Sequence, residues 1–108
     1  MTLRDIQEDV EKWVSQFTPK YWLPHEILAR LTEETGELAR EINHLFGPKR
    51  KKENESESSI GKELSDILFT VVCMANSKKI DLEEEWKTMM KEKHYGRDKN
   101  RFDKNKNI

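Results

Sequence analysis

The sequence is poor in the residues that build a large core or a covalent framework. Of its 108 residues, 34% are hydrophobic and 8% are aromatic, and Cys73 is the one cysteine. A single cysteine excludes a disulfide within the chain, which suits a reducing cytoplasm. The longest mainly apolar run, residues 67–75, is far too short to span a bilayer. We therefore expect one cytoplasmic domain that makes no contact with a membrane.

No charge of one sign dominates either. The net charge is -1, because 21 acidic residues are interleaved with 20 basic ones, and general binding to nucleic acid is therefore not expected. The N-terminus lacks the basic-then-apolar layout of a secretory signal peptide. The basic run at residues 49–52 is interpreted as part of a solvated loop rather than as a phosphate site.

What the sequence does contain is helical periodicity. Apolar residues recur at helical spacing in four segments: Leu3 to Phe17 before Thr18-Pro19, Pro24 to Gly47, Ser58 or Ser59 to Ala75, and an Asp81 cap to Gly96. Neither a strand pattern nor an internal repeat is present. We predict an all-α fold with a four-helix, bundle-like subunit. Trp13 and Phe17 are interpreted as core residues of the first segment.

The expected domain organisation is simple. One helical domain covers residues 1–95, with a mobile linker at residues 47–59, and residues 96–108 form a basic, flexible tail. Since 38% of the residues are charged, a monomer has little apolar surface to bury. The third helical segment is nevertheless apolar almost all round past Asp66. This combination predicts an oligomer whose subunits share a core.

Two pairs of acidic residues stand out in the second and third helical segments. Glu34 and Glu37 are three residues apart, as are Glu63 and Asp66, so each pair shares a helix face beside an apolar stripe. Carboxylates gathered there would repel one another and be costly to desolvate. Mg²⁺ removes that cost, because it prefers oxygen ligands and is commonly held by carboxylates and substrate phosphates. Gly36, in mid-helix, costs roughly 1 kcal/mol relative to alanine and suggests the close approach of another helix or a ligand.

Two other interpretations of the acids compete with the magnesium site. Surface ion pairs with Arg30, Arg40 and Lys62 would use the same carboxylates, but such pairs contribute little and do not explain their position beside the apolar stripe. A di-iron carboxylate bundle needs Glu-x-x-His on two helices, and the sequence offers it once, at Glu41 and His44. Ligation by oxygen alone fits Mg²⁺, or Mn²⁺, better than iron.

The acidic motifs of the second and third helical segments also resemble those of a known family. Glu33-Glu34-x-x-Glu37, a spacer and Glu63-x-x-Asp66 resemble the signature of the MazG-like all-α nucleoside triphosphate pyrophosphohydrolases, and the similarity covers roughly residues 22–101. It implies a Mg²⁺-dependent enzyme that cleaves between the α and β phosphates of an NTP or dNTP, giving a nucleoside monophosphate and pyrophosphate. It also implies a homodimer or homotetramer with sites completed across the subunit interface.

The same resemblance implies roles for the acids. Glu34, Glu37, Glu63 and Asp66 would hold one or more Mg²⁺ ions that also bind the triphosphate. Glu33 and Glu34 are the catalytic candidates, because Glu33 is placed to orient or deprotonate an attacking water.

Substrate contacts are expected at both ends of the similar region. The stretch that contains Lys93, Arg97 and Arg101 resembles the family's C-terminal phosphate-contacting segment. Trp22 and His44 flank the helix that carries Glu34 and are candidates to stack on the base or its sugar. Because this chain is shorter than dimeric dUTPases, their uracil specificity is not carried over. A phosphoribosyl-ATP pyrophosphohydrolase and a non-catalytic helical module that binds metal or nucleotide stay open as alternatives.

Overall fold

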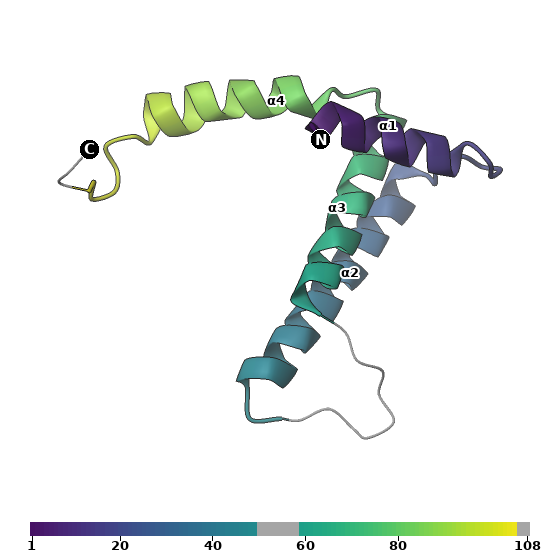
Figure 1. Cartoon of the computed structure of the whole chain (residues 1–108), viewed down its shortest axis with the longest axis horizontal. Helices are drawn as coiled ribbons and strands as arrows, with labels where there is room; N and C mark the ends of the chain where they lie inside the picture. The colour runs from purple at the N-terminus through teal and green to yellow at the C-terminus, as the bar shows by residue number, and fades with distance from the viewer. Residues whose placement is uncertain (50–58, 106–108) are drawn as a thin grey trace.

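The computed structural model describes residues 1–49 and 59–105, and these ranges contain helices and no strand (Figure 1). The α-helices are α1 (Leu3–Val14), α2 (Pro24–Phe46), α3 (Ile60–Ser77) and α4 (Leu82–Met89), and a π-helical segment, η1 (Met90–Arg97), continues α4. The predicted all-α class with four main helices is confirmed. None of the helices described combines the length and hydrophobicity that a membrane crossing requires.

Local sequence sets where each helix begins. The Thr2 hydroxyl accepts a hydrogen bond from the Asp5 N–H, and the Asp5 carboxylate accepts one from the Thr2 N–H, which makes a capping box on α1. Pro24 occupies the first turn of α2, where a missing N–H costs nothing. The side chains of Ser59 and Asp81 accept backbone hydrogen bonds from the first turns of α3 and α4. The four predicted starts are thus confirmed.

Two helix ends differ from the prediction. The first helix stops at Val14 and does not reach Phe17. The Ser15 hydroxyl donates to the Glu11 carbonyl at 2.6 Å, the kind of side-chain bond that competes with helix continuation. At the other end of the chain the helix passes Gly96 by one residue, because π-helical hydrogen bonding carries the backbone through the glycine.

The described chain is open rather than closed into a bundle. α2 and α3 lie side by side as a long antiparallel pair, and α1 crosses the end of that pair (Figure 1). α4 and η1 form an arm that leads away from the helix pair at the corner where α1 crosses the end of α3 (Figure 1). The radius of gyration is 17.9 Å, whereas a compact domain of this length has a radius of about 13 Å.

The buried core of the described chain is correspondingly small. Its buried hydrophobic residues are Val10, Val14, Ile27, Val72 and Ala75. The prediction that Trp13 and Phe17 belong to the core is wrong, since they are 54% and 50% exposed. On α3, Leu68 and Phe69 are each 40% exposed, so this apolar helix is covered on one side within the chain. The reason is that α1 and α2 are the helices packed against it, and together they leave part of its surface open.

Hydrogen bonds from α1 hold the corner where the arm begins. The Gln7 side chain donates to Asn76 Oδ1 at 2.8 Å and accepts the Leu82 N–H at 2.9 Å, so it joins α1, α3 and α4. Arg4 adds an ion pair to Asp81, with 2.8 Å between Nη2 and Oδ2, and this hydrogen bond holds the pKa of the Asp81 carboxyl below its usual value. α1 therefore fixes the direction in which α4 leaves the helix pair.

A left-handed residue closes α3. Lys79 has a φ of 56°, and the following N–H, from Ile80, donates to the Ala75 carbonyl at 2.9 Å. This is the hydrogen-bond pattern of a Schellman-type helix end, where glycine is the usual left-handed residue. The turn therefore holds a lysine in a conformation that its side chain disfavours.

Part of the predicted linker and tail lies outside the described residues. Residues 50–58 of the predicted linker at 47–59 are outside them, as are residues 106–108 of the predicted tail at 96–108. Within the described part of that tail, Asp98 is buried and pairs with Arg97 and Arg101. The domain boundaries at 95 and 96 stay a prediction.

Candidate functional site

The contact between α2 and α3 places acidic side chains inside the protein. On α2, Ile27, Glu34 and Glu41 follow one another at intervals of two helical turns, and all three are buried. On α3, Glu63 and Thr70 have the same spacing and are also buried. Because these two stripes face each other across the helix pair, the carboxylates are enclosed by the same packing that holds the helices together.

Three of the four acids predicted as metal ligands meet at this contact. Glu34 from α2 and Glu63 and Asp66 from α3 each offer a carboxylate oxygen, and these oxygens lie within 4.8 Å of one another. Glu34 is 5% exposed and Glu63 is 7% exposed. Three oxygens from two helices at this separation match the donor type that Mg²⁺ and Mn²⁺ prefer. The chemistry of the residues present therefore fits a hard divalent cation.

Arg30 contacts this acid cluster, which we define as Glu34, Glu63 and Asp66. Its guanidinium Nη2 lies 2.7 Å from Glu34 Oε1, one turn along α2, and its Nη1 lies 3.7 Å from Glu33 Oε2. One of the ion pairs from the competing interpretation of the acids is therefore present. It does not displace the metal interpretation, because Glu34 is buried inside the cluster rather than on a solvated face.

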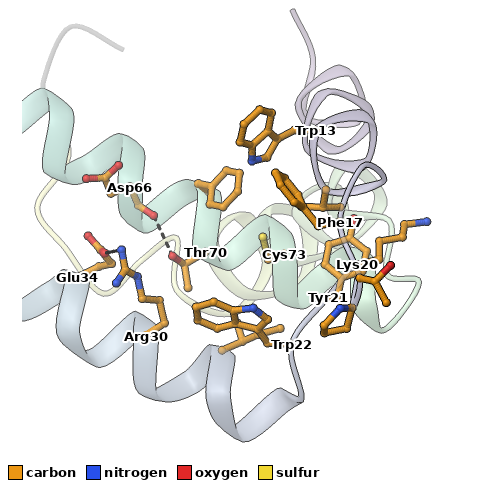
Figure 2. Close-up of a pocket in the computed structure, with 15 residues that line it drawn as sticks. Trp13, Phe17, Lys20, Tyr21, Trp22, Arg30, Glu34, Asp66, Thr70 and Cys73 are labelled. Atoms are coloured by element: carbon orange, nitrogen blue, oxygen red, sulfur yellow. Dashed lines mark hydrogen bonds and ion pairs between the residues drawn. The ribbon is translucent and has the colours of Figure 1, made fainter.

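A cavity of about 510 Å³ opens beside the acid cluster. Figure 2 shows Glu34, Asp66 and Arg30 at one end of it and the rings of Trp13, Phe17 and Trp22 toward the other. A cavity that is polar at one end and aromatic at the other is suited to a ligand with the same division.

The wall between the two ends comes from α3. Thr70 is buried, and its hydroxyl donates to the Asp66 carbonyl at 3.0 Å. Phe69 and Cys73 also line the cavity. Burial raises the pKa of the Cys73 thiol, so this group stays protonated and contributes apolar surface rather than a nucleophile.

The aromatic end is held by α1 and the segment that follows it. The rings of Trp13 and Phe17 meet edge to face with their centroids 5.3 Å apart, a favourable arrangement for an aromatic pair. Both rings, and that of Trp22, are about half exposed, at 54%, 50% and 52%. They are therefore available to a planar group that enters the cavity.

Tyr21 anchors this segment from behind. Its hydroxyl donates to Glu11 Oε1 and accepts from Asn76 Nδ2, both at 2.9 Å, and Glu11 also pairs with Lys20. Burial, which is the largest cause, raises the pKa of Tyr21 to about 12. The hydroxyl thus stays a donor across the physiological range and ties the cavity wall to α1 and α3.

The other predicted site residues lie outside the acid cluster. Glu33 and Glu37 are exposed on α2, and His44 is half-buried near the end of that helix. Within the described chain the His44 Nδ1 atom is buried without a hydrogen-bond partner. A Cβ at Gly36 would meet no described atom within 4 Å, so the close approach expected there is not made within this part of the chain.

The predicted basic contacts belong to the C-terminal part of the chain, toward which the arm of α4 and η1 leads away from α2 and α3 (Figure 1). Lys93 and Arg97 belong to η1, and Arg101 follows it. Asp98 Oδ1 accepts from Arg97 Nε at 3.0 Å and from Arg101 Nη1 at 3.3 Å. The Arg97 hydrogen bond is the main cause that holds the pKa of Asp98 below its usual value. The structure thus brings these two arginines together, but not to the acids of the same chain.

Sequence reasoning missed several residues that line the cavity. Arg30 was visible as a cation four residues before Glu34, but it is interpreted there as an ordinary surface partner. Trp13 and Phe17 share the apolar stripe of α1, and their spacing equally fits a core. Only their exposure and their position beside the cavity separate the two interpretations.

Comparison with known proteins gives consistent matches. The family model of the MazG nucleotide pyrophosphohydrolase domain matches residues 23–102. The uncharacterized protein YpjD of Bacillus subtilis (strain 168) is 48% identical over 101 residues, which cover 94% of this chain and 90% of YpjD. The crystal structure of Bacillus subtilis YPJD, a proposed pyrophosphatase, has 46% identity and a TM-score of 0.76 and covers 87% of this chain and 96% of its own. That of a Bacillus-conserved MazG protein, a nucleotide pyrophosphohydrolase, has 38% identity and a TM-score of 0.74 and covers 100% and 97%.

Proposed function

This chain belongs to the MazG nucleotide pyrophosphohydrolase domain family, and from that premise we propose that it is a Mg²⁺-dependent nucleoside triphosphate pyrophosphohydrolase. As a family member it is a hydrolase of phosphoric anhydrides. Its proposed substrate is an NTP or dNTP, which it cleaves between the α and β phosphates to a nucleoside monophosphate and pyrophosphate. The observation that carries this proposal is the acid cluster at the polar end of a cavity whose other end is aromatic.

Glu34, Glu63 and Asp66 would hold the metal, with Mg²⁺ as the physiological ion and Mn²⁺ as a substitute. Glu37 is the proposed fourth ligand, one turn after Glu34 on α2. When bound, the ion supplies charge neutralisation for the triphosphate and activation of the attacking water. The burial of Glu34 and Glu63 keeps their carboxylates in a fixed position before the ion arrives, which lowers the cost of organising the site.

Glu33 is the proposed residue that orients or deprotonates the attacking water, while Glu34 serves both as ligand and as part of the catalytic group. The Glu33 side chain is 68% exposed, so water reaches it freely. Its carboxylate is also within ion-pair distance of Arg30, at 3.7 Å. The same guanidinium lies 2.7 Å from Glu34 Oε1, so Arg30 links the Glu33 carboxylate to the acid cluster.

The aromatic end of the cavity is the proposed binding site for the base. Trp22 was the aromatic candidate from the sequence, and Trp13 and Phe17 join it here. Every nucleobase has a π-face that stacks on such rings, so these contacts favour nucleotides without choosing one base. His44 is not among the residues that line the cavity, and its contact with substrate stays a prediction.

A second copy of the chain is the proposed partner, in a homodimer or homotetramer. Large apolar side chains stay exposed along the helix pair, namely Leu28, Ile42, Leu45, Phe46, Leu64, Leu68 and Phe69. The open space beside Gly36 allows another backbone to approach α2 closely. In such an assembly Lys93, Arg97 and Arg101 of one copy would bind the phosphates of a nucleotide whose metal ion is held by the acids of another copy.

Release of pyrophosphate tests the function. A panel of ribo- and deoxynucleoside triphosphates with Mg²⁺ is incubated with the wild type, with Glu63→Gln and with Glu85→Gln. Glu85 is an exposed glutamate on α4, so its variant matches the chemical change outside the site. We expect release from the wild type and from Glu85→Gln and none from Glu63→Gln. Absence of release from every triphosphate, or an active Glu63→Gln protein, would refute the proposal.

A further inference from the structure

The ion pair between Arg30 and Glu34 is unlike an ordinary pair on a helix surface. Pairs one turn apart are common, and when both partners are exposed they contribute about 0.3–0.5 kcal/mol. Here the Glu34 side chain is 7% exposed, and its carboxylate belongs to a cluster of three acids. The Arg30 side chain is 51% exposed and also lines the cavity. One guanidinium thus reaches both the acid cluster and the cavity.

In this geometry Arg30 supplies positive charge to the acid cluster through Glu34. Its Nη2 lies at hydrogen-bond distance, 2.7 Å, from the Glu34 oxygen Oε1. A divalent cation that binds the three carboxylates needs oxygens of the same cluster and is repelled by a guanidinium beside them. Arg30 and a metal ion therefore compete for the Glu34 carboxylate.

Once a cation holds Glu34, the guanidinium loses its nearest partner. In Figure 2 the Arg30 side chain lies on the cavity side of α2, between Glu34 and the ring of Trp22. A ligand that fills the cavity from the acids to the aromatic rings passes this position. The planar fork of arginine binds phosphate oxygens in pairs, which a lysine or an amide does not.

We propose that Arg30 competes with the metal for Glu34 and, once the metal displaces it, binds the phosphates of the nucleotide. This inference rests on the proposed function, because it takes the acid cluster as the metal site. It assigns to Arg30 two effects of opposite sign: the residue weakens metal binding in the absence of nucleotide and strengthens nucleotide binding in the presence of metal. A purely structural role for the pair would move both affinities in the same direction or neither.

The predicted effect of Arg30 on metal affinity is tested by metal binding in the absence of nucleotide. Titration calorimetry with Mn²⁺ and no nucleotide compares the wild type with Arg30→Gln, Arg30→Lys and Lys87→Gln. Lys87→Gln removes a cation from a solvent-exposed pair with Glu84 on α4 and is the matched control. We expect Arg30→Gln to bind Mn²⁺ about fivefold to tenfold more tightly, because a charge-assisted hydrogen bond to Glu34 no longer opposes it. Arg30→Lys should lie between, and Lys87→Gln should match the wild type.

The second half is tested with substrate at saturating Mg²⁺. The Michaelis constant is measured for the triphosphate that releases pyrophosphate fastest. We expect Arg30→Gln to raise the Michaelis constant about tenfold, because one charged phosphate contact is lost. Lys87→Gln should change the Michaelis constant less. Arg30→Lys keeps the charge without the fork and should recover part of the loss. Circular dichroism on each variant checks that the helices are intact.

The outcomes separate this inference from the proposed function. Tighter Mn²⁺ binding together with a raised Michaelis constant in Arg30→Gln supports it. Unchanged Mn²⁺ affinity, or tighter Mn²⁺ binding with an unchanged Michaelis constant, overturns the inference while the enzyme stays active and the proposed function stands. A wild type that binds no Mn²⁺ and releases no pyrophosphate would overturn both.

Discussion

Neutralising one acid of the cluster should make the metal-free protein more stable. Asp66→Asn keeps the shape of the side chain and removes its charge, and it leaves the Arg30 to Glu34 pair in place. The wild-type carboxylates are held within 4.8 Å of one another by the packing of α2 on α3, whereas the unfolded chain lets them move apart. The folded state therefore carries a repulsion that the substitution relieves.

The size of this effect follows from the separation. Two unit charges 4.8 Å apart repel by about 0.9 kcal/mol in water and by about 3.5 kcal/mol at an effective dielectric constant near 20. Asp66 contributes to two of the three pairs in the cluster. Screening by salt and small side-chain movements reduce the sum. We expect the free energy of unfolding without metal to rise by about 1–2 kcal/mol.

Urea unfolding at one protein concentration, in EDTA and in Mg²⁺, measures the change. In EDTA the Asp66→Asn protein should be the more stable one. In Mg²⁺ at a hundred times its dissociation constant the wild type gains about 2.7 kcal/mol and should become the more stable one. Asp9→Asn, at an exposed position on α1, is the control and should show no such reversal. An Asp66→Asn protein that is no more stable than the wild type in EDTA would refute the reasoning.

Three further predictions concern the cavity wall and the turn after α3. Tyr21→Phe should lower the free energy of unfolding by about 1–2 kcal/mol at neutral pH, because Glu11 and Asn76 each lose a hydrogen-bond partner. Urea unfolding beside Tyr95→Phe measures this, and equal losses in both variants would contradict it. The pKa of Tyr21 rises from 10.0 to about 12 on folding, so the stability that this group contributes is complete below pH 10 and is lost as the pH rises toward 12. An absorbance titration should show a tyrosinate step near pH 12 that is missing from Tyr21→Phe, and its persistence there would assign it to another group. Lys79→Gly should raise the free energy of unfolding by about 0.5–1 kcal/mol, since glycine adopts a positive φ without strain, and an unchanged midpoint in thermal unfolding would argue against strain at this turn.

Local features of the chain were predictable because their causes are local. Thr2, Pro24, Ser59 and Asp81 start helices through contacts within one turn, so a short stretch of sequence contains the whole signal. The acids of α3 follow from the same kind of reasoning, since a spacing of three residues puts both on one helix face.

What escaped prediction depends on contacts between elements. The apolar stripe on α1 predicts that Trp13 lies on the inner face of the helix. It does not predict whether that face packs against another helix or borders a cavity. Arg30 precedes Glu34 by one turn in any helix, and its importance comes from the burial of Glu34 against α3. The place of Lys93 relative to the acids depends on the angle at the corner after α3, for which no periodic pattern exists. Sequence spacing carries information along an element and little about the angles between elements.

The junction at Gln7, where α1, α3 and α4 meet, determines how far a small rotation moves the end of the arm. α4 and η1 have eight residues each, so the arm extends about 20 Å beyond this junction. A rotation of about 10° there moves the far end by about 3–4 Å over such a length, which exceeds the length of a hydrogen bond. The hydrogen bonds of the Gln7 side chain thus set the position of Arg97 and Arg101 at the far end of the arm, and a small change in their geometry produces a larger displacement there.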